Sequence, residues 1–160
     1  MTGVVVQVSI SPGGVPNFAI EEGRLTEAGI TGDGWHHPYH GTRNRAILLI
    51  TAEGVDDLAA LGFPVFYGAL GENLTTRGLD RRALRIGQRF RAGEAVIQLT
   101  EVRPPCGALD VYGTGIQSAM YDVRALRGDI ESDVWGMSGF YASVIHAGML
   151  WSDDPIALLE

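Results

Sequence analysis

The hydrophobic positions of this chain fall in short runs separated by glycine-rich turns. Runs typical of β-strands occupy residues 4–8, 24–28, 45–50, 94–100, 140–145 and 155–158. Residues 88–91 and 94–100 predict a hairpin around Ala92-Gly93, and the last two runs are placed to close the sheet. The pattern therefore predicts a protein that is built mainly from short strands.

Helical periodicity is confined to two short segments. Residues 52–61 place their apolar side chains near one face, with Thr51 as the N-cap and Gly62 at the stop. Residues 119–126 predict a second short helix. Many short strands, glycine-rich turns and one or two short helices together indicate the mainly β class, in the form of a β-barrel.

Composition excludes several classes of function. The chain has 160 residues, which predicts one domain over residues 1–160, and its net charge of −7 argues against nucleic-acid binding. We find neither an apolar stretch of the ~20 residues that a bilayer requires nor a secretory signal pattern. A lone cysteine forms no internal disulfide, so the sequence favours a reducing compartment, the cytoplasm.

All twelve basic residues are arginines, and lysine is absent. A Schiff base with pyridoxal phosphate or a carbonyl substrate therefore cannot form on this chain, and no P-loop lysine exists. Any phosphate that the chain binds must be held by arginine, by hydroxyl groups or by backbone amides.

The lone cysteine, Cys106, follows Arg103-Pro104-Pro105 directly after a strand-like run. Two prolines remove two backbone donors, so the strand must end there and present the thiol on a rigid turn. A nearby guanidinium favours the thiolate, the form that attacks or binds metals. The competing interpretation is a buried structural cysteine, since free cysteine is among the most buried residue types.

Three histidines, His36, His37 and His40, lie within residues 32–41. Their spacing invites a zinc interpretation, but Pro38 prevents a helix through them and no cysteine lies nearby to complete a mixed site. We predict that these three do not bind zinc together. The segment is a polar loop or lines a cofactor, with one or two histidines facing the cleft.

Two further segments carry candidate chemistry. Residues 71–80 are polar and bounded by glycine, with hydroxyls and Arg77 suited to a phosphate or a pterin-like heterocycle. The alternative is a solvated connector whose Asn and Thr side chains satisfy turn amides. Residues 11–16 form either an anion-binding nest or, more simply, a plain turn.

Taken in order, these segments resemble the MOSC family, named for the C-terminal domain of molybdenum cofactor sulfurases. The matching pieces are SPGGVP at 11–16, GITGD at 29–33, RNRAILL at 43–49, GENLTTRGL at 71–79, LRIG at 84–87, RPPC at 103–106 and GFYASV at 139–144. Each motif alone is weak, but the ordered set is specific and covers nearly the whole chain. The chain is thus similar to a stand-alone MOSC domain.

The resemblance implies a MOSC-type β-barrel that binds the molybdenum-pterin cofactor. It assigns Cys106 as the molybdenum ligand, or as a sulfur carrier in the sulfurase context, and places Asn73 near the cofactor. Many members have lysine after the Gly-Gly-Val-Pro motif, where this chain has Asn17. Arginines would then hold the cofactor phosphate. The full set of implied cofactor-binding residues is Asn73, Thr75, Arg77, Arg103, Arg43, Arg45 and His40.

Three functions follow from this resemblance. The first is reduction of small N-hydroxylated compounds, with electrons from a separate donor protein. The second is sulfur transfer through a persulfide on Cys106, and the third is a non-catalytic cofactor-binding module. We expect Cys106, Asn73 and at least one of the four arginines 43, 45, 77 and 103 to line one cleft.

Overall fold

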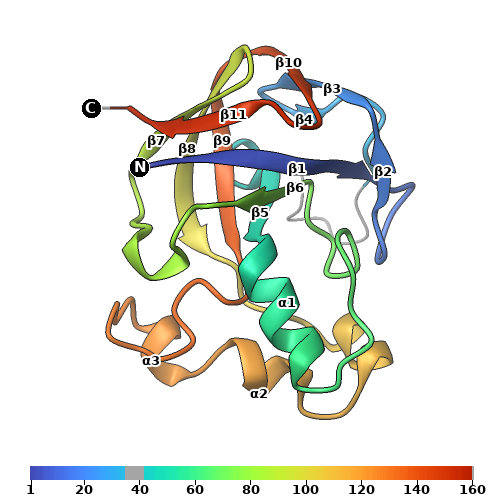
Figure 1. Cartoon of the computed structure of the whole chain (residues 1–160), viewed down its shortest axis with the longest axis vertical. Coiled ribbons are helices and arrows are strands. Elements are labelled where there is room, and N and C mark those ends of the chain that lie inside the picture. The colour runs from blue at the N-terminus through green and yellow to red at the C-terminus, as the bar shows by residue number, and fades with distance from the viewer. Residues whose placement is uncertain (35–41, 160) are drawn as a thin grey trace.

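The structure is a computed structural model that describes residues 1–34 and 42–159. Its strands form two sheets, and its helices lie beyond one end of the larger sheet (Figure 1). The strands are β1 (Thr2–Ile10), β2 (Phe18–Ile20), β3 (Glu22–Thr26), β4 (Gly29–Ile30), β5 (Ile47–Thr51), β6 (Leu74–Arg77), β7 (Arg89–Ala92), β8 (Ala95–Val102), β9 (Phe140–His146), β10 (Gly148–Trp151) and β11 (Pro155–Leu158).

The α-helices are α1 (Ala52–Ala60), α2 (Ile116–Met120) and α3 (Val123–Leu126). Three short 3₁₀ helices accompany them: η1 (Arg43–Arg45), η2 (Arg81–Ala83) and η3 (Gly107–Tyr112). None of the helices in the described part of the chain is long and apolar enough to span a membrane.

The larger sheet closes into a barrel. Its strand order is β11-β7-β8-β9-β5-β6-β1, and a further pairing of β11 with β1 joins the two ends. The pairs around this ring are antiparallel except for the parallel pair of β5 with β6. The predicted mainly β barrel is therefore confirmed, with the run at 155–158 as the closing strand. Outside the ring, β2 pairs with β1, and β10, β3 and β4 form a small second sheet.

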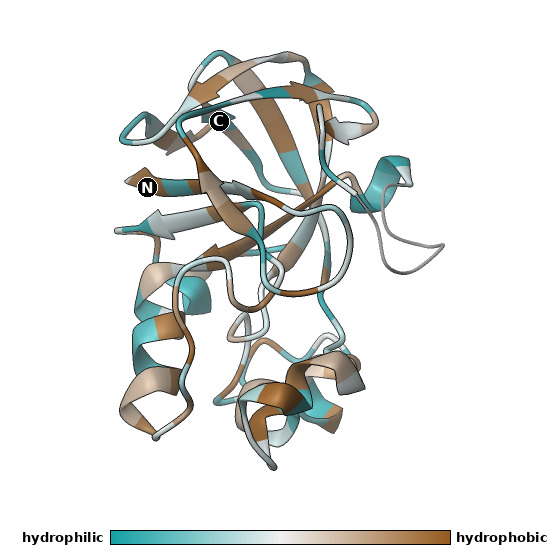
Figure 2. Cartoon of the chain, turned by 90° about the vertical axis from the view of Figure 1, so that its right-hand side faces the viewer, coloured by the Kyte–Doolittle hydropathy of each residue, from teal (hydrophilic) through white to brown (hydrophobic). Residues whose placement is uncertain are grey.

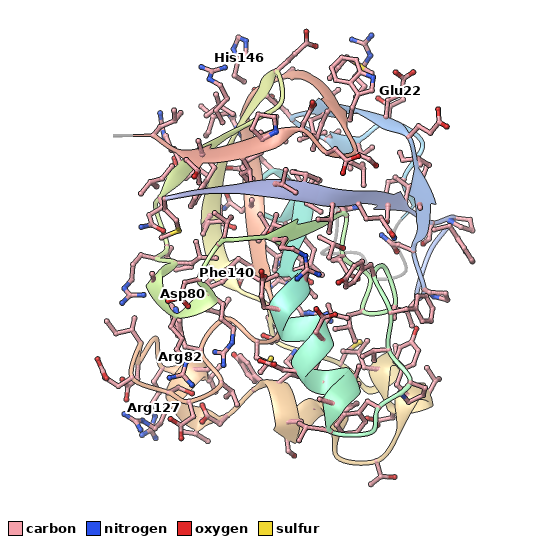
Figure 3. All side chains as sticks on the ribbon, in the orientation of Figure 1. Glu22, Asp80, Arg82, Arg127, Phe140 and His146 are labelled. Carbon is pink, nitrogen blue, oxygen red and sulfur yellow. The ribbon has the colours of Figure 1, made fainter. Side chains whose placement is uncertain are left out.

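Strand β5 is buried on both faces, which explains its unbroken apolar sequence. Ile47 and Leu49 point into the barrel core, whereas Leu48 and Ile50 belong to a second core that includes Val55 of α1. Figure 2 shows the corresponding apolar colouring on the barrel strands and on the helices at one end. Figure 3 places Phe140 in the interior, while Glu22 and His146 project outward at the end of the molecule away from the helices.

Helix α1 forms as predicted from its local signals. The side chain of Thr51 accepts a hydrogen bond from the backbone N–H of Gly54 at 3.1 Å, and the helix ends one residue before Leu61. The predicted hairpin is also confirmed, with β7 and β8 joined at Gly93-Glu94. These elements depend on neighbours in the sequence, so the sequence alone specifies them.

Three predictions of secondary structure need correction. The single helix over 119–126 is instead two helices, because Tyr121 is extended and the side chain of Asp122 caps α3 by accepting the N–H of Ala125 at 2.7 Å. Arg45 lies in η1 rather than in a strand. Residues 74–77, which we interpreted as a polar loop, form the barrel strand β6 because Thr75 and Thr76 are buried by tertiary packing.

Candidate functional site

A pocket of about 150 Å³ lies beside the start of β5. Its walls come from segments far apart in the sequence: the loop after β1, the turn after β4, the loop before β6, the segment after β8, and Tyr141 of β9. Most of the exposed wall is apolar carbon, with a few polar groups converging on it. This composition is typical of small-molecule sites.

Cys106 lies on the rim of this pocket and is exposed. Strand β8 ends at Val102, the segment from Arg103 to Pro105 runs without regular structure, and Cys106 is the extended residue that precedes η3. The prolines therefore end the strand as predicted. The alternative of a buried structural cysteine is wrong, because the thiol is open to solvent and to ligands.

Arg103 is the buried cation of the pocket, with 5% of its surface exposed. Its Nε donates to the carbonyl of Ser138 at 3.0 Å, and its Nη2 donates to the carbonyl of Leu70 at 2.7 Å. Across residues 1–34 and 42–159, none of the ion pairs includes Arg103. A guanidinium has five N–H donors, so these two bonds do not use all of them.

The charge on Arg103 is balanced only at longer range. Burial lowers the pKa of its guanidinium, while the electrostatic fields of Tyr141, Glu72 and Cys106 oppose that change. Arginine nevertheless stays protonated in proteins. The pocket therefore contains a permanent positive charge beside a thiol.

Asn73 lines the pocket, but both N–H donors of its amide and its amide oxygen bond to the protein. Its Oδ1 accepts the N–H of Leu48 at 3.0 Å, and its Nδ2 donates to the carbonyl of Ser9 at 3.1 Å and to Asp33 Oδ2 at 2.8 Å. These bonds join β1, β5 and the turn after β4 at one point. The side chain consequently positions the walls of the pocket.

Asp33 presents a half-buried carboxylate to the same pocket. Its Oδ1 accepts the backbone N–H of Ser11 at 3.0 Å, and its Oδ2 accepts the amide of Asn73. Burial raises the pKa of this carboxyl, although the hydrogen bonds from Ser11, Asn73 and Gly34 oppose the change. Asp33 was not predicted as a site residue, and the Gly-Asp turn was the signal for it.

Glu72 lies behind the pocket wall and is completely buried. Its Oε1 accepts the N–H of Leu70 at 3.2 Å, and its Oε2 accepts the hydroxyl of Thr75 at 3.5 Å. Burial raises the pKa of Glu72, while hydrogen bonds from backbone N–H groups and the field of Arg103 oppose the change. This carboxyl supports the loop that borders the pocket.

Arg45 and Tyr141 form another part of the wall. The guanidinium of Arg45 lies 4.8 Å from the centre of the Tyr141 ring and forms an ion pair with Glu101. Because of that pair, Arg45 carries less uncompensated charge than Arg103. Tyr141 was missed as a site residue, since its apolar run indicated only a strand.

Asn17 stands where the resemblance to the MOSC family implies a lysine. Its side chain is buried and donates to the carbonyls of Gly71 and Glu72 at 3.3 and 3.2 Å. The backbone N–H of Asn17 also donates to the carbonyl of Gly68 at 2.8 Å. Gly68 has φ +98, and a Cβ there would lie 2.4 Å from the carbonyl oxygen of Asn17. Here the position holds two loops together.

Several predicted residues are placed away from the pocket. Arg43 is exposed and pairs with Glu27, and Arg77 is an exposed partner of Asp56. Thr75 is fully buried and does not line the pocket. His36, His37 and His40 lie outside the described residues. The structure thus brings together Cys106, Asn73, Arg45 and Arg103 of the predicted set.

The barrel and its pocket define a class of protein that comparisons with known proteins identify. Residues 36–157 match the model of the MOSC domain, so the chain belongs to the MOSC family. It is 31% identical to protein YiiM of Escherichia coli strain K12 over 144 residues, which are 85% of this chain and 58% of YiiM.

A solved structure supports the fold at full length. The crystal structure of YiiM from Escherichia coli matches 99% of this chain and 70% of that chain, with 28% identity and a TM-score of 0.70. The chain is also 29% identical over 137 residues to a protein named Reductase from Gibberella moniliformis, covering 82% of this chain and 23% of that protein. This chain therefore corresponds to part of each curated relative.

Proposed function

We propose that the pocket binds the molybdenum-pterin cofactor through Cys106 and that the loaded protein reduces small N-hydroxylated compounds. The observation that carries this proposal is the pairing of an exposed thiol with a buried cation in one pocket. The fungal relative named Reductase, similar over 82% of this chain, supports a reductive activity. MOSC membership favours the cofactor.

The donor set fits this cofactor. Molybdenum in the pterin cofactor is ligated by sulfur, and a cysteine thiolate is a matching soft ligand. Within the described residues, no three His, Cys, Asp or Glu side chains form a metal-binding group. In this proposal the chain supplies Cys106 as a ligand, and the cofactor supplies sulfur ligands of its own.

The other pocket residues would contribute to cofactor binding through their charge and through the size of the pocket. The donors of Arg103 that face the pocket would hold an anionic oxygen, and Arg45 would add a second cation at the wall. A pocket of about 150 Å³ accepts a group of about the size of one benzene ring, so part of the cofactor would lie outside it. When bound, the cofactor supplies a centre that accepts and donates electrons.

The proposed reaction requires an external electron source. A lone cysteine cannot ligate an iron–sulfur cluster, so this chain would receive electrons from a separate donor protein. The same lone thiol favours a reducing compartment, and we place the protein in the cytoplasm.

Sulfur transfer is the second candidate, and the exposure of Cys106 favours it. The thiolate would attack the outer sulfur of a donor persulfide, form Cys106–S–SH and release the donor thiolate. The step balances, because one S–S bond breaks as another forms. A cofactor-binding module without catalysis is the third candidate.

Analysis of protein purified from a molybdenum-replete host separates these candidates. We expect molybdenum and pterin bound to the wild-type chain, and reduction of an aromatic amidoxime by reduced viologen. An added sulfur atom on Cys106 without molybdenum would support sulfur transfer instead. Cofactor bound without any activity would support the third candidate. Absence of both molybdenum and a persulfide would refute the first two candidates.

A matched pair of arginine variants tests how the pocket holds the cofactor. Arg103→Met should lose at least ~10-fold in cofactor retention, because the buried cation is removed. Arg124→Met is the control, since Arg124 is exposed and pairs with Asp129 outside the pocket. Arg103→Lys shows whether charge alone suffices if Arg103→Met folds poorly. Equal retention in all of these proteins would contradict the role of Arg103.

A further inference from the structure

Asp33 is an acidic side chain in a pocket that otherwise presents cations. It lines the same pocket as Cys106 and Arg103, and no ion pair among the described residues includes it. A carboxylate that merely balanced Arg103 would be expected within ion-pair distance of it. Asp33 therefore has another role than neutralising the buried cation.

The carboxyl group of Asp33 is held in a fixed orientation. The N–H of Ser11 donates to Oδ1 at 3.0 Å, and the amide of Asn73 donates to Oδ2 at 2.8 Å. Asn73 cannot rotate away, because its other amide donor and its oxygen are bound to the backbone of β1 and β5. A carboxyl group has about four acceptor positions, and the hydrogen bonds from Ser11, Asn73 and Gly34 leave room for a proton on one of its oxygens.

The electrostatic surroundings favour proton exchange at this group. Burial raises the pKa of Asp33. The other charged or titratable side chains among the described lining residues are Arg45, Arg103, Cys106 and Tyr141. Arginine stays charged, and burial raises the pKa of Tyr141 from an already high value. Asp33 is thus the carboxyl of the described wall that can hold and release a proton.

We propose that Asp33 is the proton donor of this pocket and that it protonates the leaving hydroxyl oxygen of an N-hydroxylated substrate. This inference rests on the proposed reductase function. The geometry that carries it is a fixed, half-buried carboxyl facing the same cavity as the thiol and the buried cation. The role assigned to Asn73 is to position Asp33 rather than to contact the substrate.

The proposed step is balanced. The substrate R–NH–OH takes two electrons from two equivalents of a one-electron reductant, such as a reduced viologen, and two protons. The N–O bond breaks, an N–H bond forms, and the hydroxyl leaves as water. Asp33 supplies the proton that converts the leaving hydroxyl into water, and solvent then returns a proton to its carboxylate.

The first experiment titrates Asp33 directly, without cofactor or substrate. Protein labelled with ¹³C at aspartate carboxyls is followed by NMR against pH, and Asp33→Asn assigns the signal. We expect a midpoint above the usual range of aspartate, and a higher one in Asn73→Ala, because a hydrogen bond that favours the charged form is lost. A midpoint at or below the usual value would overturn the inference, because the carboxyl would stay ionised.

The second experiment measures reduction of an aromatic amidoxime by reduced viologen against pH. Wild-type turnover should fall as pH rises through the midpoint of Asp33, because the protonated form is lost. Asp33→Asn should lower turnover by ~10²-fold or more and should remove this decline of turnover with rising pH. Asp57→Asn, an exposed carboxylate of α1 outside the pocket, should keep the wild-type profile.

The two experiments separate failure of the inference from failure of the function. An active wild type with an unchanged profile in Asp33→Asn would refute the role of Asp33 and leave the reductase standing. An inactive wild type that carries molybdenum would refute the reductase and the donation step with it, whatever the midpoint. A raised midpoint in the wild type, together with loss of the pH-dependent decline of turnover in Asp33→Asn, supports both the role of Asp33 and the reductase function.

Discussion

The interior of the barrel and the pocket beside β5 share a strand but are built on opposite principles. In the barrel core, the buried side chains are apolar and fill space, as with Phe90 and Ile97. At the pocket, buried polar groups replace them: Arg103 is held by carbonyls, Asn73 joins three segments, and Glu72 lies among backbone amides. Burying polar groups contributes less to stability than burying apolar ones.

This contrast separates the source of stability from the source of chemistry. The barrel core tolerates little loss of volume, because protein interiors are close-packed. At the pocket, the thiol of Cys106 is exposed and the carboxyl of Asp33 is half-buried. Substitution of either side chain therefore creates little empty volume inside the protein. Substitutions in the two regions should therefore differ in kind as well as in size.

The largest effect should come from Phe90→Ala in the barrel core. Phe90 is completely buried, so removing its ring should lower the free energy of unfolding by about 3–5 kcal/mol. Urea denaturation measures the change. Phe18→Ala is the control, because Phe18 is 61% exposed and should change stability by less than ~1 kcal/mol. Similar losses in both variants would remove the distinction between core and surface.

Asn73→Ala should have the next largest effect. It removes the hydrogen bonds that Asn73 makes to the N–H of Leu48, the carbonyl of Ser9 and the carboxyl of Asp33, and an unpaired buried group costs about 1–3 kcal/mol. Since water from the pocket can reach some of them, we expect a total loss of about 2–4 kcal/mol by urea denaturation. Ser118→Ala, at an exposed position, should stay within ~0.5 kcal/mol. A neutral Asn73→Ala would contradict its joining role.

Glu72→Gln should change how stability depends on pH. The pKa of Glu72 is raised in the folded protein, so the folded state holds its proton more tightly than the unfolded state. Its contribution is present below the unfolded pKa and is lost as pH rises toward the folded pKa. The glutamine variant keeps the hydrogen-bonding shape without titrating.

We therefore expect Glu72→Gln to gain stability relative to wild type as pH rises from about 4 toward neutral. Urea denaturation of both proteins across this range measures the difference. Glu131→Gln, at an exposed position, should show no such trend. If Glu72→Gln instead lost stability relative to wild type as pH rises, the pKa of Glu72 would be lowered in the folded protein.

The sequence predicted those parts of the fold that depend on neighbouring residues. The Thr51 cap specified α1, the Ala92-Gly93 turn specified the hairpin, and the apolar run at 155–158 was correctly placed as the closing strand. Strand β6 escaped because its threonines are polar, and only packing against β1 and β5 buries them.

The pocket was predictable to a similar degree and for related reasons. The Pro-Pro-Cys turn and its arginine are local features, so the placement of Cys106 and Arg103 followed from the sequence and the family resemblance. Asp33 and Tyr141 reach the pocket only when the turn after β4 and strand β9 come together around β5. The three hydrogen bonds of the Asn73 amide likewise depend on three distant partners, which no sequence pattern reveals.

The smallest effect on stability and the largest on function should meet in one variant, Cys106→Ser. The side chain is exposed and a hydroxyl is nearly isosteric with a thiol, so the melting temperature of the cofactor-free protein should stay at the wild-type value. Serine stays protonated near neutral pH, is a harder ligand than thiolate, and cannot form a persulfide.

Molybdenum content per chain, measured on wild type and Cys106→Ser purified in parallel from a molybdenum-replete host, tests the central claim most directly. The account predicts bound molybdenum in the wild type and its loss in the variant, with equal melting temperatures of the two cofactor-free proteins. Equal molybdenum content in both proteins, or none in either, would contradict the assignment of Cys106 as the molybdenum ligand.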